Sequence, residues 1–97
     1  MEAGPSKAPQ PYKATPVFDH ETLPQALRSE HRTKEGTWGL LRVLEGRVLL
    51  TFVDPRREIA VSPGRPAVIP PQETHFVTLD GPMRMQVEFY REAPTAV

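Results

Sequence analysis

Two histidines stand where polar stretches run into apolar ones, and imidazole groups at such positions can meet in one pocket. His31 opens a polar stretch that leads to an apolar run from Trp38, and His75 opens another apolar run. Neutral imidazole is the commonest protein ligand for first-row metals. We therefore expect His31 and His75 to share a pocket, where they could begin a site for Zn, Fe, Mn or Ni.

A metal site of this kind needs a third protein ligand. The loop candidates are Glu35, Gln72 and Glu73. Glu88 fits less well, because its apolar neighbours in an alternating run take the inward side of a strand. The alternative is that the two histidines only form hydrogen bonds inside a polar pocket that holds no metal.

A hydroxyl and an ammonium group follow His31 closely in the sequence. Thr33 and Lys34 could hold a carboxylate or another oxyanion by hydrogen bonding and charge. Trp38 and Gln72 are further candidates for binding the same small molecule. The alternatives are a solvated loop lysine and a tryptophan that belongs to the core.

Composition limits the classes of partner. The chain has 97 residues, enough for one domain with one small core. Its 12 basic and 12 acidic residues cancel, and it lacks a basic face with stacking aromatic residues. It has no cysteine and no apolar run of membrane-span or signal-peptide type. We expect a cytoplasmic protein without nucleic-acid or membrane partners.

Short apolar runs between turns that contain proline or glycine predict an all-β domain. The predicted strands are residues 17–18, 38–45, 47–53, 58–61, 66–69, 75–79 and 83–90. Glu45-Gly46 and Asp80-Gly81 have the composition of tight hairpins. The sequence therefore predicts a small antiparallel barrel or sandwich.

The ends of the chain differ in composition from its middle. Residues 1–15 are rich in proline and alanine and are predicted to form a flexible arm, followed by one domain at 16–91 and a loose end at 92–97. A short helix is predicted within residues 19–27, with Thr22 as its N-cap.

Two of the predicted strands are apolar on both faces. Residues 38–45 and 47–53 carry apolar side chains at both alternating positions. Such strands are covered on both faces. In a chain this small the second cover must include a partner subunit or the N-terminal arm, so we expect a homodimer.

Two segments resemble the motifs of the cupin superfamily. Residues 64–75 read Gly, five residues, Pro, one residue, Gln72, two residues and His75, which is close to the second cupin motif with Gln72 in place of glycine. His31 stands ahead of Gly46 as a first-motif histidine does. Gly39 occupies the position of the glutamate ligand, so the usual set of three histidines and one glutamate is incomplete.

A more specific resemblance covers nearly all of residues 16–91. The matching strings are Leu23-Pro24-Gln25, His31-x-Thr33-Lys34-x-Gly36-Thr37-Trp38-Gly39, Val43-Leu44-x-Gly46, Pro71-Gln72-x-x-His75 and Glu88-Phe89-Tyr90. They resemble the TehB/YeaR-like domain, a cupin-like module at the N-terminus of the tellurite-resistance methyltransferase TehB that also occurs alone. The resemblance implies a small jelly-roll barrel or sandwich with one short N-terminal helix, associated with metal in some members. Without a methyltransferase segment after residue 91, tellurite methylation is not expected.

Three hypotheses follow. The leading one is a cupin-like protein that binds a small polar molecule, an anion or a divalent metal near His31 and His75, with a link to stress or tellurite resistance. The second is a metal-dependent oxygenase or isomerase acting on a small molecule. The third is a structural module in which the apolar strands serve dimerisation.

Overall fold

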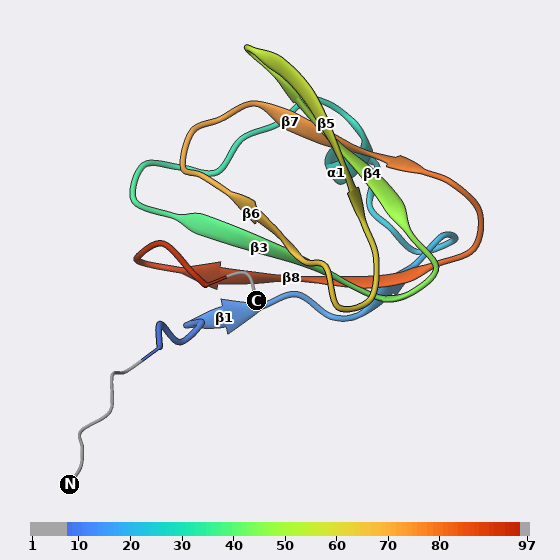
Figure 1. Cartoon of the computed structure of the whole chain (residues 1–97), viewed down its shortest axis with the longest axis horizontal. Coiled ribbons are helices and arrows are strands. Elements are labelled where there is room, and N and C mark those ends of the chain that lie inside the picture. Colours follow the sequence, from blue (N-terminus) through green and yellow to red (C-terminus); the bar gives the residue numbers. More distant parts are fainter. Residues whose placement is uncertain (1–7, 96–97) are drawn as a thin grey trace, which may run out of the picture.

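The computed structural model describes residues 8–95 and contains two antiparallel sheets that face each other (Figure 1). The five-stranded sheet has the order β1-β8-β3-β6, with β2 also paired to β8, and the three-stranded sheet has the order β5-β4-β7. The elements are β1 (Lys13–Ala14), β2 (Phe18–Asp19), α1 (Gln25–Arg28), β3 (Trp38–Glu45), β4 (Val48–Val53), β5 (Arg56–Val61), β6 (Ala67–Ile69), β7 (His75–Leu79) and β8 (Arg84–Tyr90).

The prediction of a mostly β, antiparallel domain is confirmed. The predicted strand 38–45 coincides with β3, and the other predicted strands are found within a few residues of their expected bounds. The described strands form two separate sheets and no closed barrel, so the barrel form of the prediction is not found. The predicted arm and loose end fall partly on residues 1–7 and 96–97, which lie outside the described residues.

The core lies between the two sheets. In β8 the alternation predicted from sequence turns Met85 and Val87 inward, and Leu41 and Val43 of β3 lie beside them. The other sheet contributes inward side chains from β4, β5 and β7. Its buried members are Val48, Leu50, Phe52, Val61 and Val77.

Two predicted hairpins are wrong. The strands that flank Gly46, β3 and β4, belong to different sheets, and so do β7 and β8 on either side of Gly81. Each of these turns carries the chain from one sheet to the other. Gly46 has φ +75°, and a Cβ built on it would overlap the carbonyl oxygen of Pro82 and lie 3.1 Å from Met83. Glycine is thus required there by close approach as well as by backbone conformation.

The predicted short helix is found as α1, the one helix of the described residues, but it begins later than predicted and its predicted cap is wrong. Pro24 holds the N-cap position of α1 and gives no side-chain hydrogen bond. The Thr22 hydroxyl instead accepts a hydrogen bond from the backbone N–H of Asp19 at 2.8 Å, because the Asp19 carboxylate and Thr22 together close the turn after β2. No helix in the described part of the chain is long and apolar enough to cross a membrane.

The outer face of the larger sheet is partly covered by its own chain. Leu40 is fully buried although it faces away from the core, and Tyr90 is buried beside it. After β8 the chain turns back along this sheet (Figure 1). Pro94, in this last described segment, is buried. Leu44 remains 43% exposed. The predicted homodimer stays a prediction.

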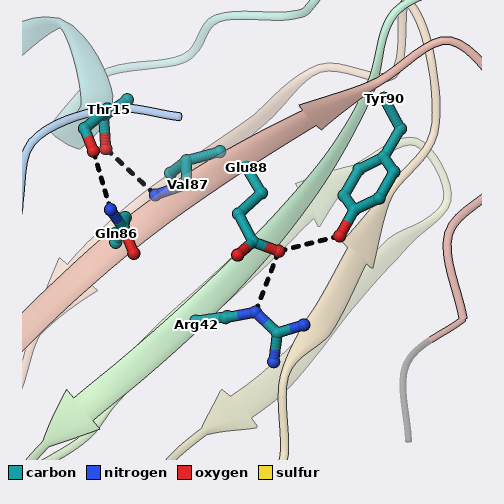
Figure 2. Close-up of polar contacts among 6 residues, drawn as sticks. All are labelled: Thr15, Arg42, Gln86, Val87, Glu88 and Tyr90. Carbon is teal, nitrogen blue, oxygen red and sulfur yellow. Dashed lines mark hydrogen bonds and ion pairs between the residues drawn. The ribbon is translucent and has the colours of Figure 1, made fainter. Parts of the chain in front are cut away.

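A polar network also lies on this outer face. The Glu88 carboxylate accepts hydrogen bonds from Arg42 Nε at 2.9 Å and from the Tyr90 hydroxyl at 2.8 Å (Figure 2). Burial, together with the hydrogen bond to Glu88, raises the pKa of Tyr90. Glu88 therefore has two partners on the side of the sheet opposite the histidines.

Candidate functional site

A cavity of about 580 Å³ opens between the two sheets. It is lined by strands of both sheets, by α1 and by the loop of residues 31–37, which we call the histidine loop. Its apolar lining residues are Leu27, Leu41, Ile69, Val77, Met85, Val87 and Phe89. This size and lining are typical of sites for small organic molecules.

Positive charge gathers at the cavity without a matching carboxylate. Lys13, Arg32 and Lys34 line it, whereas none of the described lining residues is Asp or Glu. Within residues 8–95 none of these three cations forms an ion pair, although five arginines elsewhere do. A low-dielectric cleft lined by one sign of charge favours a ligand of the opposite sign.

The two histidines meet in this cavity. His31 and His75 form an isolated antiparallel bridge, in which each backbone N–H donates to the other residue's carbonyl, at 3.0 Å from His31 and 2.8 Å from His75. Their ring centroids lie 4.2 Å apart and both residues line the cavity. The bridge fixes the histidine loop to the start of β7.

The tautomer of each ring follows from its hydrogen bond. His31 Nδ1 lies 2.9 Å from the carbonyl oxygen of Ser29, and His75 Nδ1 lies 2.7 Å from that of Glu73. A carbonyl oxygen can only accept, so Nδ1 carries the hydrogen in both rings. In its neutral form, a ring held in this way has its lone pair on Nε2, and neither Nε2 has a hydrogen-bond partner among the described residues.

His75 is the more buried of the pair, with a fractional exposure of 2%. Burial is the main cause that lowers the pKa of His75 below its ordinary value of 6.5, and the neighbouring His31 lowers it further. The hydrogen bond to the Glu73 carbonyl acts in the opposite direction. The resulting side chain is neutral near pH 7, buried, and short of one partner.

These residues do not fit a metal held by the protein alone. Within the described range, no three His, Cys, Asp or Glu side chains are grouped to hold a metal ion. The Glu73 carboxylate accepts a hydrogen bond from Arg57 at 2.6 Å, and Glu35 does not line the cavity. Two imidazoles remain, one ligand short of the usual set.

Of the predicted ligand-binding residues, the structure brings Thr33 and Lys34 into the cavity lining and leaves Trp38 and Gln72 outside it. Gly39 faces the cavity, so strand alternation turns Trp38 to the opposite side of β3. Gln72 is exposed in a turn with φ +62°, and its backbone N–H donates to the Thr33 carbonyl at 3.0 Å.

The N-terminal segment contributes residues that sequence reasoning missed. Tyr12, Lys13 and Thr15 line the cavity from the edge of β8. Thr15 secures this segment, because its hydroxyl accepts from the N–H of Val87 at 3.0 Å and its carbonyl accepts from Gln86 Nε2 at 2.9 Å (Figure 2). Tyr12 is the aromatic residue of a segment that has few other side chains to bury. It is the one feature of the sequence that indicates a contact between this segment and the cavity.

Comparison with known proteins gives a consistent result. The family of TehB-like domains matches residues 13–87. The probable S-adenosyl-L-methionine-dependent methyltransferase TehB of Haemophilus influenzae (strain 10810) is 49% identical over 37 residues, which are 38% of this chain and 13% of that protein. TehB from strain ATCC 51907 matches to the same extent.

Comparison with solved structures shows a similar fold over nearly the whole chain. The crystal structure of Haemophilus influenzae TehB matches with a TM-score of 0.75 and 30% identity, over 86% of this chain and 31% of TehB. A protein from Escherichia coli (strain K12) matches with a TM-score of 0.77 and 20% identity, over 97% of this chain and all of that one. The chain thus spans less than a third of TehB.

Proposed function

We propose that this chain, which belongs to the TehB-like family, binds a small organic anion in the cavity between its two sheets. The observation that carries the proposal is the charge of the lining: Lys13, Arg32 and Lys34 are present, and no carboxylate of a described residue opposes them. An anion bound there gains charge-assisted hydrogen bonds without displacing an internal ion pair.

The apolar part of the cavity favours an organic ligand over a bare oxyanion. Leu27, Val87 and Phe89 give the ligand a hydrophobic surface that an inorganic ion would leave without contacts. A carboxylate with a short apolar body satisfies both parts of the lining.

The similarity to TehB suggests what anion binding by this chain could serve. TehB is named as a probable methyltransferase, and this chain covers 31% of its crystal structure. We assign to this chain the capture of an anion. A link to tellurite resistance remains a proposal. Since tellurite is itself an oxyanion, it is a direct competitor to include.

Isothermal titration of the full chain tests the proposal. Hexanoate and benzoate are expected to bind saturably, benzamide much more weakly because it lacks charge, and tellurite more weakly than hexanoate because it lacks an apolar body. Lys34→Gln should weaken hexanoate binding about fivefold, the effect of losing roughly 1 kcal/mol from one partly exposed charge contact. Raising the salt concentration should weaken it as well.

Arg47→Gln is the matched control, because Arg47 is exposed, lies outside this cavity and pairs with Asp80. Its affinity for hexanoate should equal that of the wild type. Equal binding of benzamide and benzoate, or the absence of saturable binding by any carboxylate, would refute the proposal. Tellurite binding more tightly than both carboxylates would replace the organic anion with an inorganic one.

The expected divalent metal is tested in the same samples. Stoichiometric Zn, Fe, Mn or Ni that is lost in both His31→Ala and His75→Ala would support a metal completed by ligands from outside the chain. A metal-free protein whose unfolding is unchanged by a chelator would rule against that expectation.

A further inference from the structure

A buried histidine nitrogen without a partner is the feature of the cavity that anion binding alone does not explain. His75 is 2% exposed, yet its Nε2 forms no hydrogen bond with any described residue. An acceptor that no protein donor satisfies, in a residue that lines a cavity, is open to a donor from that cavity. A proton received from a ligand would satisfy this one.

We propose that His75 removes a proton from carbon and returns one, in a 2-oxo acid held in this cavity, which makes the chain a catalyst of enolisation. The inference rests on the proposed binding of an organic anion. Nothing outside the chain and the substrate is required, because the reaction is a proton transfer without change of oxidation state.

The arrangement of the rings supports the role of a base. The hydrogen bond from Nδ1 to the Glu73 carbonyl orients the His75 ring and reserves the Nε2 lone pair. His31 has the same arrangement through Ser29, and its ring centroid lies 4.2 Å from that of His75. A second imidazole at this distance can pass the proton between His75 and solvent, because His31 is only partly buried.

The charge of the lining selects the class of substrate. When the C3–H bond of a 2-oxo acid breaks, its electron pair moves into the C2–C3 bond and the carbonyl π pair moves onto oxygen. Positive groups near that oxygen stabilise the enolate. Lys13, Arg32 and Lys34 line the cavity and can hold both the carboxylate and the enolate oxygen. The apolar lining accommodates the side chain on C3.

Hydrogen exchange measures the step directly. The full chain is incubated with 2-oxobutanoate in deuterium oxide, and loss of the C3 proton signal is followed by NMR. The expected exchange is saturable and at least tenfold faster than with an equal concentration of free imidazole. His75→Gln should reduce it to the imidazole level. His20→Gln should leave it unchanged, because His20 is exposed and lies outside the cavity.

The pattern of labelling keeps the test decisive if the His75 variant fails to fold. A base fixed in an asymmetric cavity removes one of the two C3 hydrogens, so the mass of the product should pause at one deuterium. Free imidazole takes both hydrogens alike. Exchange no faster than with imidazole, or equal loss of both hydrogens, would overturn the inference.

The binding measurement separates this inference from the proposal on which it rests. Saturation-transfer NMR on the same samples reports whether 2-oxobutanoate occupies the cavity. Saturable binding without exchange refutes the proton transfer and leaves anion binding intact. Absence of binding by 2-oxobutanoate and by hexanoate refutes both.

Discussion

Replacing Gly46 by alanine tests the crossing between the two sheets. Gly46 has φ +75°, and an added Cβ would overlap the carbonyl oxygen of Pro82 and lie 3.1 Å from both Cα and Cβ of Met83. Those atoms lead into β8, which pairs along its length with β3. The backbone of Pro82 therefore cannot retreat without disturbing the strand that forms one wall of the cavity.

The cost has two parts that a second glycine separates. The left-handed conformation costs a residue with a Cβ about 1–2 kcal/mol. Overpacking against a backbone that cannot move adds about 1–3 kcal/mol, so Gly46→Ala should lose about 2–5 kcal/mol in all. Gly64 has φ +82° with no atom within 4 Å of its added Cβ, so Gly64→Ala should lose only the first part.

Urea unfolding of the wild type and both variants measures the difference. Small domains are stable by about 5–15 kcal/mol, so the larger loss is a large share of the total and shifts the midpoint clearly. Gly46→Ala should be less stable than Gly64→Ala by about 1–3 kcal/mol. Equal losses in the two variants would show that Gly46 is not in close contact with Pro82, and would refute this account of the crossing.

Three further predictions concern the cavity and its walls. The free energy of unfolding should fall as pH drops below 6.5, because burial lowers the pKa of His75 and the unfolded chain then binds the proton more readily. Urea titrations between pH 7.5 and 5.5 check this. In the His75→Gln variant the free energy of unfolding should depend less steeply on pH. Thr15→Val should lower the free energy of unfolding by about 1 kcal/mol, because it removes the acceptor for the Val87 N–H. Hydrogen exchange should become faster at the Val87 amide. The control Thr78→Val, at an exposed position, should leave that exchange rate unchanged. Glu88→Gln should also cost about 1 kcal/mol in thermal unfolding, since the partner Arg42 is 38% exposed and solvent screens the pair; loss of more than twice that would mean a stronger contact than the exposure indicates.

The strands could be predicted from sequence, but the connections between them could not. Alternating and two-faced apolar runs define β3 and β8 because burial acts on each strand locally. A turn that contains glycine has the same composition whether it closes a hairpin or carries the chain to another sheet. Only the pairing of β3 with β8, distant in sequence, decides that Gly46 is a crossing.

In the candidate site, too, some residues could be predicted from sequence and others could not. The histidines and the polar stretch after His31 could be selected by type and spacing, whereas the contribution of Lys13 depends on a pairing with Phe89 across the whole chain. Trp38 was selected by its chemistry, and its exclusion from the cavity follows from strand alternation once Gly39 is known to face inward.

Gly39 affects both the space inside the cavity and the charge of its lining. Its inward position on β3 lies beside Ile69 and Val87, at 3.4 and 3.7 Å from an added Cβ, so a long side chain there would extend into space that the cavity now occupies. The cupin-like spacing would place a glutamate ligand at this position, and that assignment stays a prediction. Glycine here gives the cavity neither a third metal ligand nor a negative charge. The cations of the lining are therefore unopposed by this part of β3, which favours an anion in this cavity.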